Sequence, residues 1–555
     1  MIHAVILCSF FPNNGIIFFD LHNHFFIVTK RTNHVLKQEY RMDRRQFLYG
    51  SAALSLMAAL PSVPRAFASE GPTVLTSKGA LRGRIVDGVH VFRGVPCGMP
   101  PYQGKYRLAL PEFVPAWNGV VDAVTPGDLP LQFGNKKDPV LGGGDCLRLN
   151  IWTPAPGATR CPVIVYIPGG GSISCNNNDP RFNGMSFAKN GVILVTANYR
   201  VNVDGFLKIK GVPANLALRD MMFALRWVQD NIAAFGGDPD NVTVYGQSAG
   251  ATHITSLLSS PLSKGLFRRA ILQSPAALAQ YDPETSSEVS RRLLAFYGVE
   301  DSRDAVAAIP FEKLLTFRAF NAARLKEPEW HHLLGANVAP FKPYYDGEVL
   351  LKRPVDAIAE GAARGIDLMV GSTEEEWRWY TVPNGSIDRI GEGATKLLLA
   401  AGKLPADLAD KYRAAGRGKT AGEVFTALQS DFIFRLPANK VLESQAKAGG
   451  KTWAYSFGWK SPAANGRLGA AHSVDLAYTF KTHHVDNPRV KNTVGENPCD
   501  ALADAMHKAW VSFAKTGDPG WSPFDLEERR TMRFDTESRE VLDPWKTERQ
   551  AMKLA

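Results

Sequence analysis

The stretch VTVYGQSAGA, Val242–Ala251, combines two opposite local preferences. The β-branched and aromatic residues of VTVY favour a strand. The small residues of GQSAG favour a turn too tight for larger side chains, and the residues from Ala249 onward favour a helix. A strand, a sharp turn that carries Ser248 and a helix together form the pattern of a nucleophile elbow, which presents a serine hydroxyl at the edge of a sheet.

The flanking sequence alternates short apolar runs with helical patterns. CPVIVYI (161–167) and GVILVTANY (191–199) fit strands that are buried on both faces. Residues 214–237 repeat apolar side chains near the 3.6-residue period, which predicts a long helix capped by Asn215 and ended by Gly236. Asp87-Gly88 predicts the turn of a β-hairpin. This alternation predicts an α/β fold with a mostly parallel central sheet flanked by helices.

Two long segments do not follow the strand–helix alternation. Residues from about 280 to 350 and from 385 to 450 are mostly helical in pattern. We expect them to be helical insertions that cover the sheet and the active site. Residues 69–555 are therefore predicted to form a single domain.

The composition is that of an ordinary globular protein, with 45% hydrophobic and 21% charged residues among 555. The formal net charge is +10, and part of it lies near the N-terminus. Residues 1–68 hold seven Lys/Arg and three Asp/Glu. The rest of the chain therefore has 57 Lys/Arg and 51 Asp/Glu, a net charge of +6. Since no dense basic run remains, the sequence does not predict nucleic-acid binding.

The N-terminal region resembles an export signal. Arg44 and Arg45 are followed by an apolar run and by the A-x-A pattern Ala66–Ala68, which is typical of a twin-arginine signal peptide over residues 42–68. The competing interpretation is a buried helix. Pro61 and Pro64 interrupt the run, so we expect no stable membrane span after cleavage. The protein is therefore expected to be exported, either periplasmic or secreted.

Residues 1–41 precede this signal and do not fit it. They are apolar but are interrupted by proline, asparagine, aspartate and histidine residues. This pattern predicts neither a membrane helix nor a domain. Our hypothesis is that translation starts at Met42 and that residues 1–41 are a non-native extension.

A serine needs a base to remove its proton, an acid to orient the base, and N–H donors for the oxyanion. Gly169, Gly170 and Gly171 directly follow the strand pattern VIVYIP. Glycines at this place let backbone amides approach a substrate oxygen, although a flexible turn would look the same. No metal or cofactor is expected, since the cysteine spacing does not suggest a zinc site.

Several blocks resemble the type-B carboxylesterases and cholinesterases, which have the α/β-hydrolase fold. FGGDPDNVTVYGQSAG (235–250) is similar to the family's serine signature, and GDCLRLNIW (144–152) to its second signature. The resemblance extends from about residue 72 to the end of the chain. It implies a single α/β-hydrolase domain and a Ser-Glu-His triad in that chain order.

The resemblance assigns the remaining site residues. The family's acid lies in a block that starts here at Gly371, and counting along GSTEEEW places the acid at Glu376, with Glu374 and Glu375 as rivals. The block AAHSVDL makes His472 the base. The competing histidines are His253, His483, His484 and His507. The oxyanion donors implied by the resemblance are the N–H groups of Gly170, Gly171 and Ala249.

The activity implied is hydrolysis of neutral, small-molecule carboxylic esters through an acyl-enzyme on Ser248. A non-catalytic, cholinesterase-like binding protein is the alternative from another class, and an amidase or carbamate hydrolase would use the same triad. Ser172 stands where the family often has an aromatic residue, which implies a wider or more polar acyl pocket.

The charge around the nucleophile differs from that of cholinesterases. Gln247 stands where those enzymes have a glutamate. The tryptophan that they place about ten residues before the signature cysteine is also missing, and Lys136, beside Lys137, occupies that position. Choline esters are therefore expected to be poor substrates.

Five cysteines follow the predicted signal, so at least one is unpaired. Cys146 matches one half of a family disulfide. Cys97 is the only upstream candidate to pair with it in the mature chain, and the sequence leaves this pairing open.

Overall fold

The computed structural model describes residues 16–19, 25–31, 34–40, 71–134, 138–157, 159–324, 327–334 and 340–552. It divides into two units, Met1–Glu70 and Gly71–Ala555. In the first unit, β1 (Ile16–Phe19), β2 (Phe25–Arg31) and β3 (His34–Tyr40) form an antiparallel sheet. Apolar runs such as FFIV pair as strands here, and the interpretation of residues 1–41 as a non-native extension stays a prediction. The predicted signal peptide, residues 42–68, lies outside the described residues.

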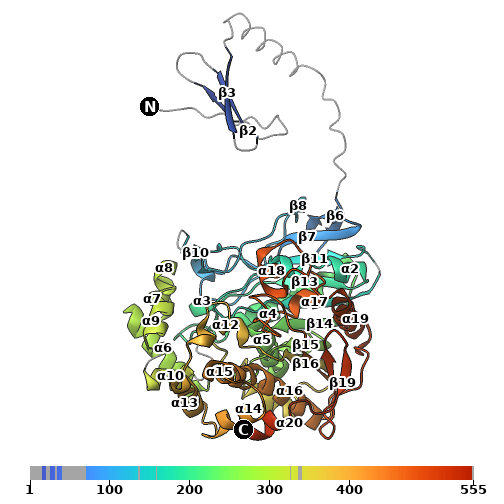
Figure 1. Cartoon of the computed structure of the whole chain (residues 1–555). Coiled ribbons are helices and arrows are strands. Elements are labelled where there is room, and N and C mark those ends of the chain that lie inside the picture. Colours follow the sequence, from blue (N-terminus) through green and yellow to red (C-terminus); the bar gives the residue numbers. More distant parts are fainter. Residues whose placement is uncertain are drawn as a thin grey trace, which may run out of the picture. The chain divides into compact units, whose positions relative to one another are not determined.

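The second unit contains an 11-stranded sheet (Figure 1). Its six central strand pairs, from β13 to β18, are parallel, and antiparallel pairs close both edges. This confirms the predicted mostly parallel sheet. In spatial order the strands are β19 (Arg539–Val541), β18 (Thr531–Phe534), β17 (Thr452–Phe457), β16 (Asp367–Thr373), β15 (Arg269–Gln273), β14 (Gly237–Gln247), β12 (Cys161–Ile167), β13 (Ile193–Ala197), β11 (Arg148–Thr153), β7 (Val89–Pro96) and β6 (Arg84–Val86).

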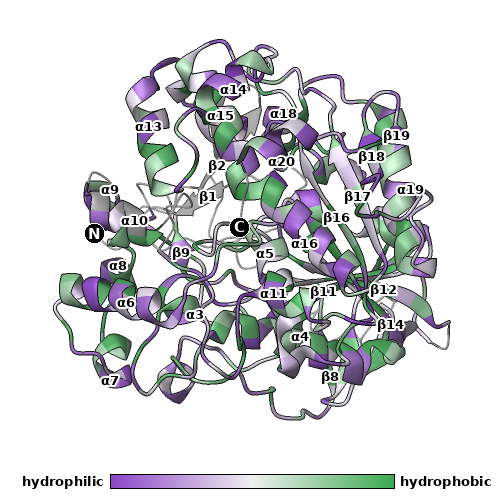
Figure 2. Ribbon diagram, turned by 90° about the horizontal axis from the view of Figure 1, so that it is seen from below, coloured by the Kyte–Doolittle hydropathy of each residue, from purple (hydrophilic) through white to green (hydrophobic). Residues whose placement is uncertain are grey.

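Both faces of the sheet are buried. Along β12, Val163, Val165 and Ile167 belong to one hydrophobic core, whereas Ile164 and Tyr166 belong to the other. This alternation follows from the two-residue period of a strand and explains the continuous apolar runs in the sequence. Helices that cover the sheet carry both hydrophobic and hydrophilic residues (Figure 2). They include α4 (Leu216–Asn231), α5 (Ala249–Ser259), α11 (Pro354–Ala359), α16 (Leu436–Lys447) and α19 (Asp500–Thr516).

Two helical insertions lie between consecutive strands of the sheet, as the sequence predicted. The first lies between β15 and β16, and the second between β16 and β17. The first comprises α6 (Pro283–Tyr297), α7 (Arg303–Ala307), α8 (Phe311–Leu314), α9 (Phe317–Arg324) and α10 (Pro328–Leu334). The second comprises α12 (Arg378–Thr381), α13 (Glu392–Ala401), α14 (Leu408–Ala414), α15 (Ala421–Ser430) and α16.

Two predicted local features can be compared in detail. The hairpin turn at Asp87-Gly88 is confirmed, with both residues at positive φ between β6 and β7. Gly236 ends the helical segment in a left-handed conformation, also as predicted. The expected cap at Asn215 was wrong, because its amide binds the backbone of Tyr344 instead of the helix start.

The remaining described α-helices and strands are short. They are α2 (Met185–Lys189), α3 (Asn202–Phe206), α17 (Leu476–Thr479), α18 (Pro488–Val494), α20 (Lys546–Met552), and the small sheets of β4 (Thr73–Leu75), β5 (Ala80–Arg82) and β8 (Val120–Asp122), and of β9 (Gln132–Phe133) and β10 (Val140–Leu141). In the described part of the chain, no helix combines the length and the apolar character that crossing a bilayer requires.

Candidate active site

Ser248 lies in the sharp connection between β14 and α5. Its backbone has φ 58° and ψ −126°, a conformation that costs energy for any residue with a Cβ atom. The turn needs its glycines, because a Cβ on Gly250 would lie 2.1 Å from the carbonyl oxygen of Ile167. The Ser248 N–H donates to the Gln273 carbonyl at 2.8 Å and so ties the turn to the neighbouring strand.

Glu376 and His472 come together beside this turn. Glu376 follows β16 and is fully buried, and His472 lies in the loop between β17 and α17 and is 3% exposed. The His472 Nδ1 atom is hydrogen-bonded to the Glu376 Oε2 atom. The other carboxylate oxygen accepts the Thr373 N–H at 2.8 Å, and the His472 N–H donates to the Glu376 carbonyl at 3.1 Å. These bonds fix both side chains.

The two rival glutamates have other partners. Glu374 forms an ion pair with Arg533 at 2.8 Å. Glu375 accepts the Ala470 N–H at 2.9 Å and pairs with Arg378 at 3.1 Å. Of the three consecutive glutamates, Glu376 is the one that the structure places against His472.

The other candidate histidines are engaged elsewhere. His253 is buried in α5, where burial lowers its pKa to about 3, and its Nε2 atom lies 3.3 Å from the Ser172 hydroxyl. His507 Nδ1 donates to the Thr479 carbonyl at 2.8 Å. His483 and His484 both contact Asp500, and His483 is buried against Tyr478 rather than lying in an open polar loop.

Gln247 makes a contact that the sequence did not reveal. Its amide nitrogen lies 3.0 Å from the Nε2 atom of His472 and 2.9 Å from the Ser473 hydroxyl. Because the Gln247 amide donates to the Nε2 atom of His472, that atom carries no proton, and the ring proton lies on Nδ1, facing Glu376. Gln247 therefore holds His472 in the tautomer in which Nε2 can accept a proton.

The glycine loop after β12 lies against the nucleophile. A Cβ on Gly169 would come 2.7 Å from the Gln247 carbonyl oxygen and 3.0 Å from the Cβ of Ser248, so glycine permits this close approach. Gly170 and Gly171 have φ values of 136° and 62°. Within the described part of the chain, their N–H groups make no hydrogen bond, while the Gly170 carbonyl accepts from Ile173 and Ser174. Ala249 supplies the first N–H of α5.

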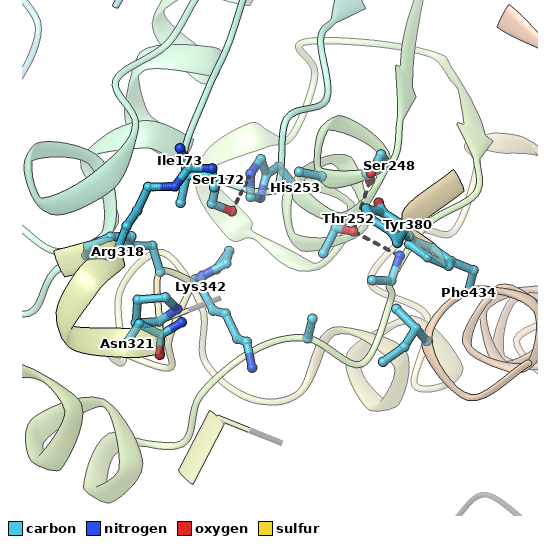
Figure 3. A pocket seen from close by; sticks show the side chains of 18 of the residues that line it. Ser172, Ile173, Ser248, Thr252, His253, Arg318, Asn321, Lys342, Tyr380 and Phe434 are labelled. Carbon is cyan, nitrogen blue, oxygen red and sulfur yellow. Dashed lines mark hydrogen bonds between the residues drawn. The ribbon is translucent and has the colours of Figure 1, made fainter. Parts of the chain in front are cut away.

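Two cavities meet at Ser248. The one we call the aromatic cavity has a volume of about 350 Å³. Arg318 and the Ser172–His253 pair lie on one side of it, and Tyr380 and Phe434 lie on the other (Figure 3). Ser172 thus adds a polar group to this cavity, as its position in the sequence implied. The aromatic lining residues are Phe317, Phe341, Trp377, Tyr380 and Phe434.

The second cavity, which we call the arginine cavity, has a volume of about 570 Å³. It contains the glycine loop, Gln247, Ser248 and His472. The charged residues that line it are Asp179, Arg181, Arg318 and Arg489. Sequence reasoning missed the arginines because they come from three distant segments and match no motif. Lys136 and Lys137, which the sequence placed near this region, lie outside the described residues.

Asp475 is a second buried carboxyl group near His472. Burial and the charge of Glu376 raise its pKa to about 8, so the folded protein keeps this group protonated at neutral pH. Asp475 is therefore a neutral carboxyl group in the same buried region as the His472–Glu376 pair.

The raised pKa of Asp475 predicts how stability depends on pH. The unfolded state releases the Asp475 proton above about pH 4, whereas the folded state keeps it up to about pH 8. Stability should therefore fall as pH rises through this window, by at most about 1.4 kcal/mol per pH unit. Asp475→Asn should remove this contribution. Denaturant unfolding of both proteins at several pH values tests it, and parallel pH dependences would contradict it.

The cysteines are all free in the described part of the chain. Cys97 and Cys146 are buried thiols in separate hydrophobic clusters, and burial raises the pKa of each. The disulfide that the sequence left open is not formed.

The chain is similar to known proteins over most of its length. The model of the carboxylesterase family matches residues 70–553. Para-nitrobenzyl esterase of Bacillus subtilis is 33% identical over 86% of this chain and 98% of that protein. Phenmedipham hydrolase of Pseudarthrobacter oxydans is 32% identical over 85% of this chain and 96% of that protein. The crystal structure of carboxylesterase EST55 from Geobacillus stearothermophilus has a TM-score of 0.75 and 34% identity, covering 86% of this chain and 99% of that one.

Proposed function

The chain belongs to the carboxylesterase family and is a carboxylic ester hydrolase with the α/β-hydrolase fold, and from this premise we propose that Ser248, His472 and Glu376 form its catalytic triad. One observation carries the proposal. His472, which is bound to the buried Glu376, and the strained Ser248 turn line the same cavity, so the nucleophile, the base and the acid that orients the base belong to one site, as acyl transfer requires.

Each residue has a defined role in this proposal. The Ser248 Oγ atom attacks the ester carbonyl carbon, and the Nε2 atom of His472 takes the serine proton. The ionised Glu376 stabilises the imidazolium. The N–H groups of Gly170, Gly171 and Ala249 donate to the oxyanion. His472 then protonates the leaving alcohol, and a water molecule repeats the cycle on the acyl-enzyme.

Gln247 has to move during this cycle. Its amide occupies the Nε2 atom that receives the serine proton. When Nε2 carries that proton it becomes a donor, and the amide nitrogen of Gln247, also a donor, no longer fits it. The side chain therefore turns away, or presents its Oε1 atom, when the substrate binds.

The substrates that we propose are neutral small-molecule esters rather than choline esters. One relative is named for the hydrolysis of phenmedipham, so hydrolysis of amides or carbamates by the same triad is a second candidate. We also propose that the chain is exported through its twin-arginine pattern, as Arg44 and Arg45 suggest.

We expect a neutral butyrate ester to be hydrolysed with higher kcat/KM than butyrylcholine. Gln247 removes a negative charge beside the nucleophile, and three arginines in the arginine cavity repel a quaternary ammonium group. Losing a cation–π contact alone costs about 0.5–2 kcal/mol, or roughly 2- to 30-fold. Steady-state kinetics on ethyl butyrate and butyrylcholine in a pH-stat measures this, and faster hydrolysis of butyrylcholine would contradict it.

A further inference from the structure

The two cavities differ in which catalytic group they contain, and this difference assigns the two sides of the ester. The leaving alcohol must receive its proton from His472. His472 lines the arginine cavity, whereas the lining of the aromatic cavity contains Ser248 but not His472. The alcohol therefore fits the arginine cavity and the acyl group fits the aromatic cavity. This assignment rests on the proposed function.

The arginine cavity has more positive than negative charge. Among its described lining residues, Asp179 is the one acidic side chain. Arg181 binds both oxygens of this carboxylate at 3.0 Å, and Arg489 binds one of them at 2.9 Å. Although burial opposes ionisation, these two arginines lower the pKa of Asp179, so its charge is present and already matched. The two arginines and the one aspartate together leave one positive charge in excess.

Arg318 adds a second uncompensated charge. Its guanidinium carbon lies 4.3 Å from the centroid of the Phe133 ring, which also lines the arginine cavity. Among the described residues, no carboxylate lies within ion-pairing distance of Arg318. A guanidinium over the face of a ring can still direct the N–H groups at its own edge to a planar anion and bind it at two points.

The aromatic cavity offers less positive charge to a ligand than the arginine cavity. Arg318 lines it too, but Lys342 is its other basic residue, and burial lowers the pKa of that amine to about 7. The Lys342 amine donates to the Leu334 carbonyl and lies 4.6 Å from the ring centroid of Tyr281. In Figure 3 its side chain extends away from Ser248. Arg318 lies between the two cavities, whereas Arg181 and Arg489 line the arginine cavity alone, so the larger share of the positive charge lies on the alcohol side.

We propose that this enzyme prefers esters whose alcohol part carries a carboxylate, and that Arg318 is the specificity-determining residue that binds it. Arg181 and Arg489 add to the attraction from the wall that carries Asp179. The carboxylate lies on the leaving-group side, so it departs with the alcohol product.

Two ester pairs test which side carries the charge. The first compares the butyrate esters of 4-hydroxyphenylacetic acid and 4-hydroxyphenylacetamide, whose methylene group keeps the phenol leaving groups similar. The second compares the 4-nitrophenyl half ester of glutaric acid with 4-nitrophenyl butyrate. In the first pair we expect kcat/KM to be roughly tenfold higher for the anionic ester than for the neutral one. In the second pair we expect the anionic ester to have no such advantage. Added salt should lower the first ratio.

Variants connect the preference to one residue. Arg318→Gln should lower the first ratio several-fold and weaken its salt dependence, and what remains is the attraction of the excess charge at Arg181 and Arg489. Arg324→Gln is the matched control, because Arg324 lies on the same helix, pairs with Glu327 and lines neither cavity. The control should keep both the ratio and its salt dependence.

Each result separates this inference from the proposed function. If the neutral esters are hydrolysed and the anionic member of the first pair is no better, the inference is wrong while the esterase function stands. A preference found only in the second pair would reverse the assignment of the two cavities and also overturn it. If no ester is hydrolysed by the wild type, the proposed function itself fails.

Discussion

Ser248→Ala should lower kcat by roughly 10⁴- to 10⁶-fold while leaving the protein folded. Without the hydroxyl there is no nucleophile for the acyl-enzyme, and only the oxyanion donors and substrate binding still assist the reaction. Alanine has the same Cβ atom as serine, so the strained backbone at position 248 changes little. The measurement is kcat on 4-nitrophenyl butyrate, with circular dichroism and a thermal melt as controls for folding.

A surviving activity of more than about a tenth of the wild-type value would show that another nucleophile is used. The Ser172 hydroxyl, beside His253, is the alternative in the same cavity. Ser172→Ala is therefore the matched control, and we expect it to retain most of its activity.

Glu376→Gln should lower kcat by roughly 10³- to 10⁴-fold, because an amide cannot stabilise the His472 imidazolium and no longer fixes the proton on Nδ1. Glu375→Gln should change kcat by no more than about threefold, since Glu375 binds the Ala470 N–H and Arg378 instead of His472. Both substitutions remove one negative charge from adjacent positions, so their difference isolates the contact with the histidine. Stopped-flow or steady-state kinetics on one activated ester gives both values.

Glu374→Gln extends this series to a residue whose ion pair with Arg533 lies outside both cavities. We expect its effect to appear in the melting temperature rather than in kcat. If Glu375→Gln proved more damaging to kcat than Glu376→Gln, the acid would have to be reassigned.

The sequence predicted the features that depend on local patterns. The runs in β12 and β13 required a sheet buried on both faces, and the small residues around Ser248 required a tight turn. Glu376 could be found by counting from Gly371, because that block is continuous along the chain. These predictions needed only neighbours in sequence.

The features that the sequence did not predict depend on contacts between distant segments. Asn215 has the residue type of a helix cap, but the backbone of Tyr344, 129 residues away, binds its amide. Gln247 was read as a lost charge, whereas its amide binds His472, 225 residues further on. Arg181, Arg318 and Arg489 meet around one cavity only after folding. No periodicity or spacing carries that information.

The backbone at position 248 has a consequence for how this chain can change under selection. A non-glycine residue at φ 58° and ψ −126° costs on the order of 1–3 kcal/mol, and glycine would relieve most of it. Laboratory evolution for heat resistance alone would therefore favour the loss of the nucleophile. A lineage screened for both heat resistance and turnover has to gain its stability at other positions, so the reactive turn persists as an inherited weakness around which the rest of the chain adapts.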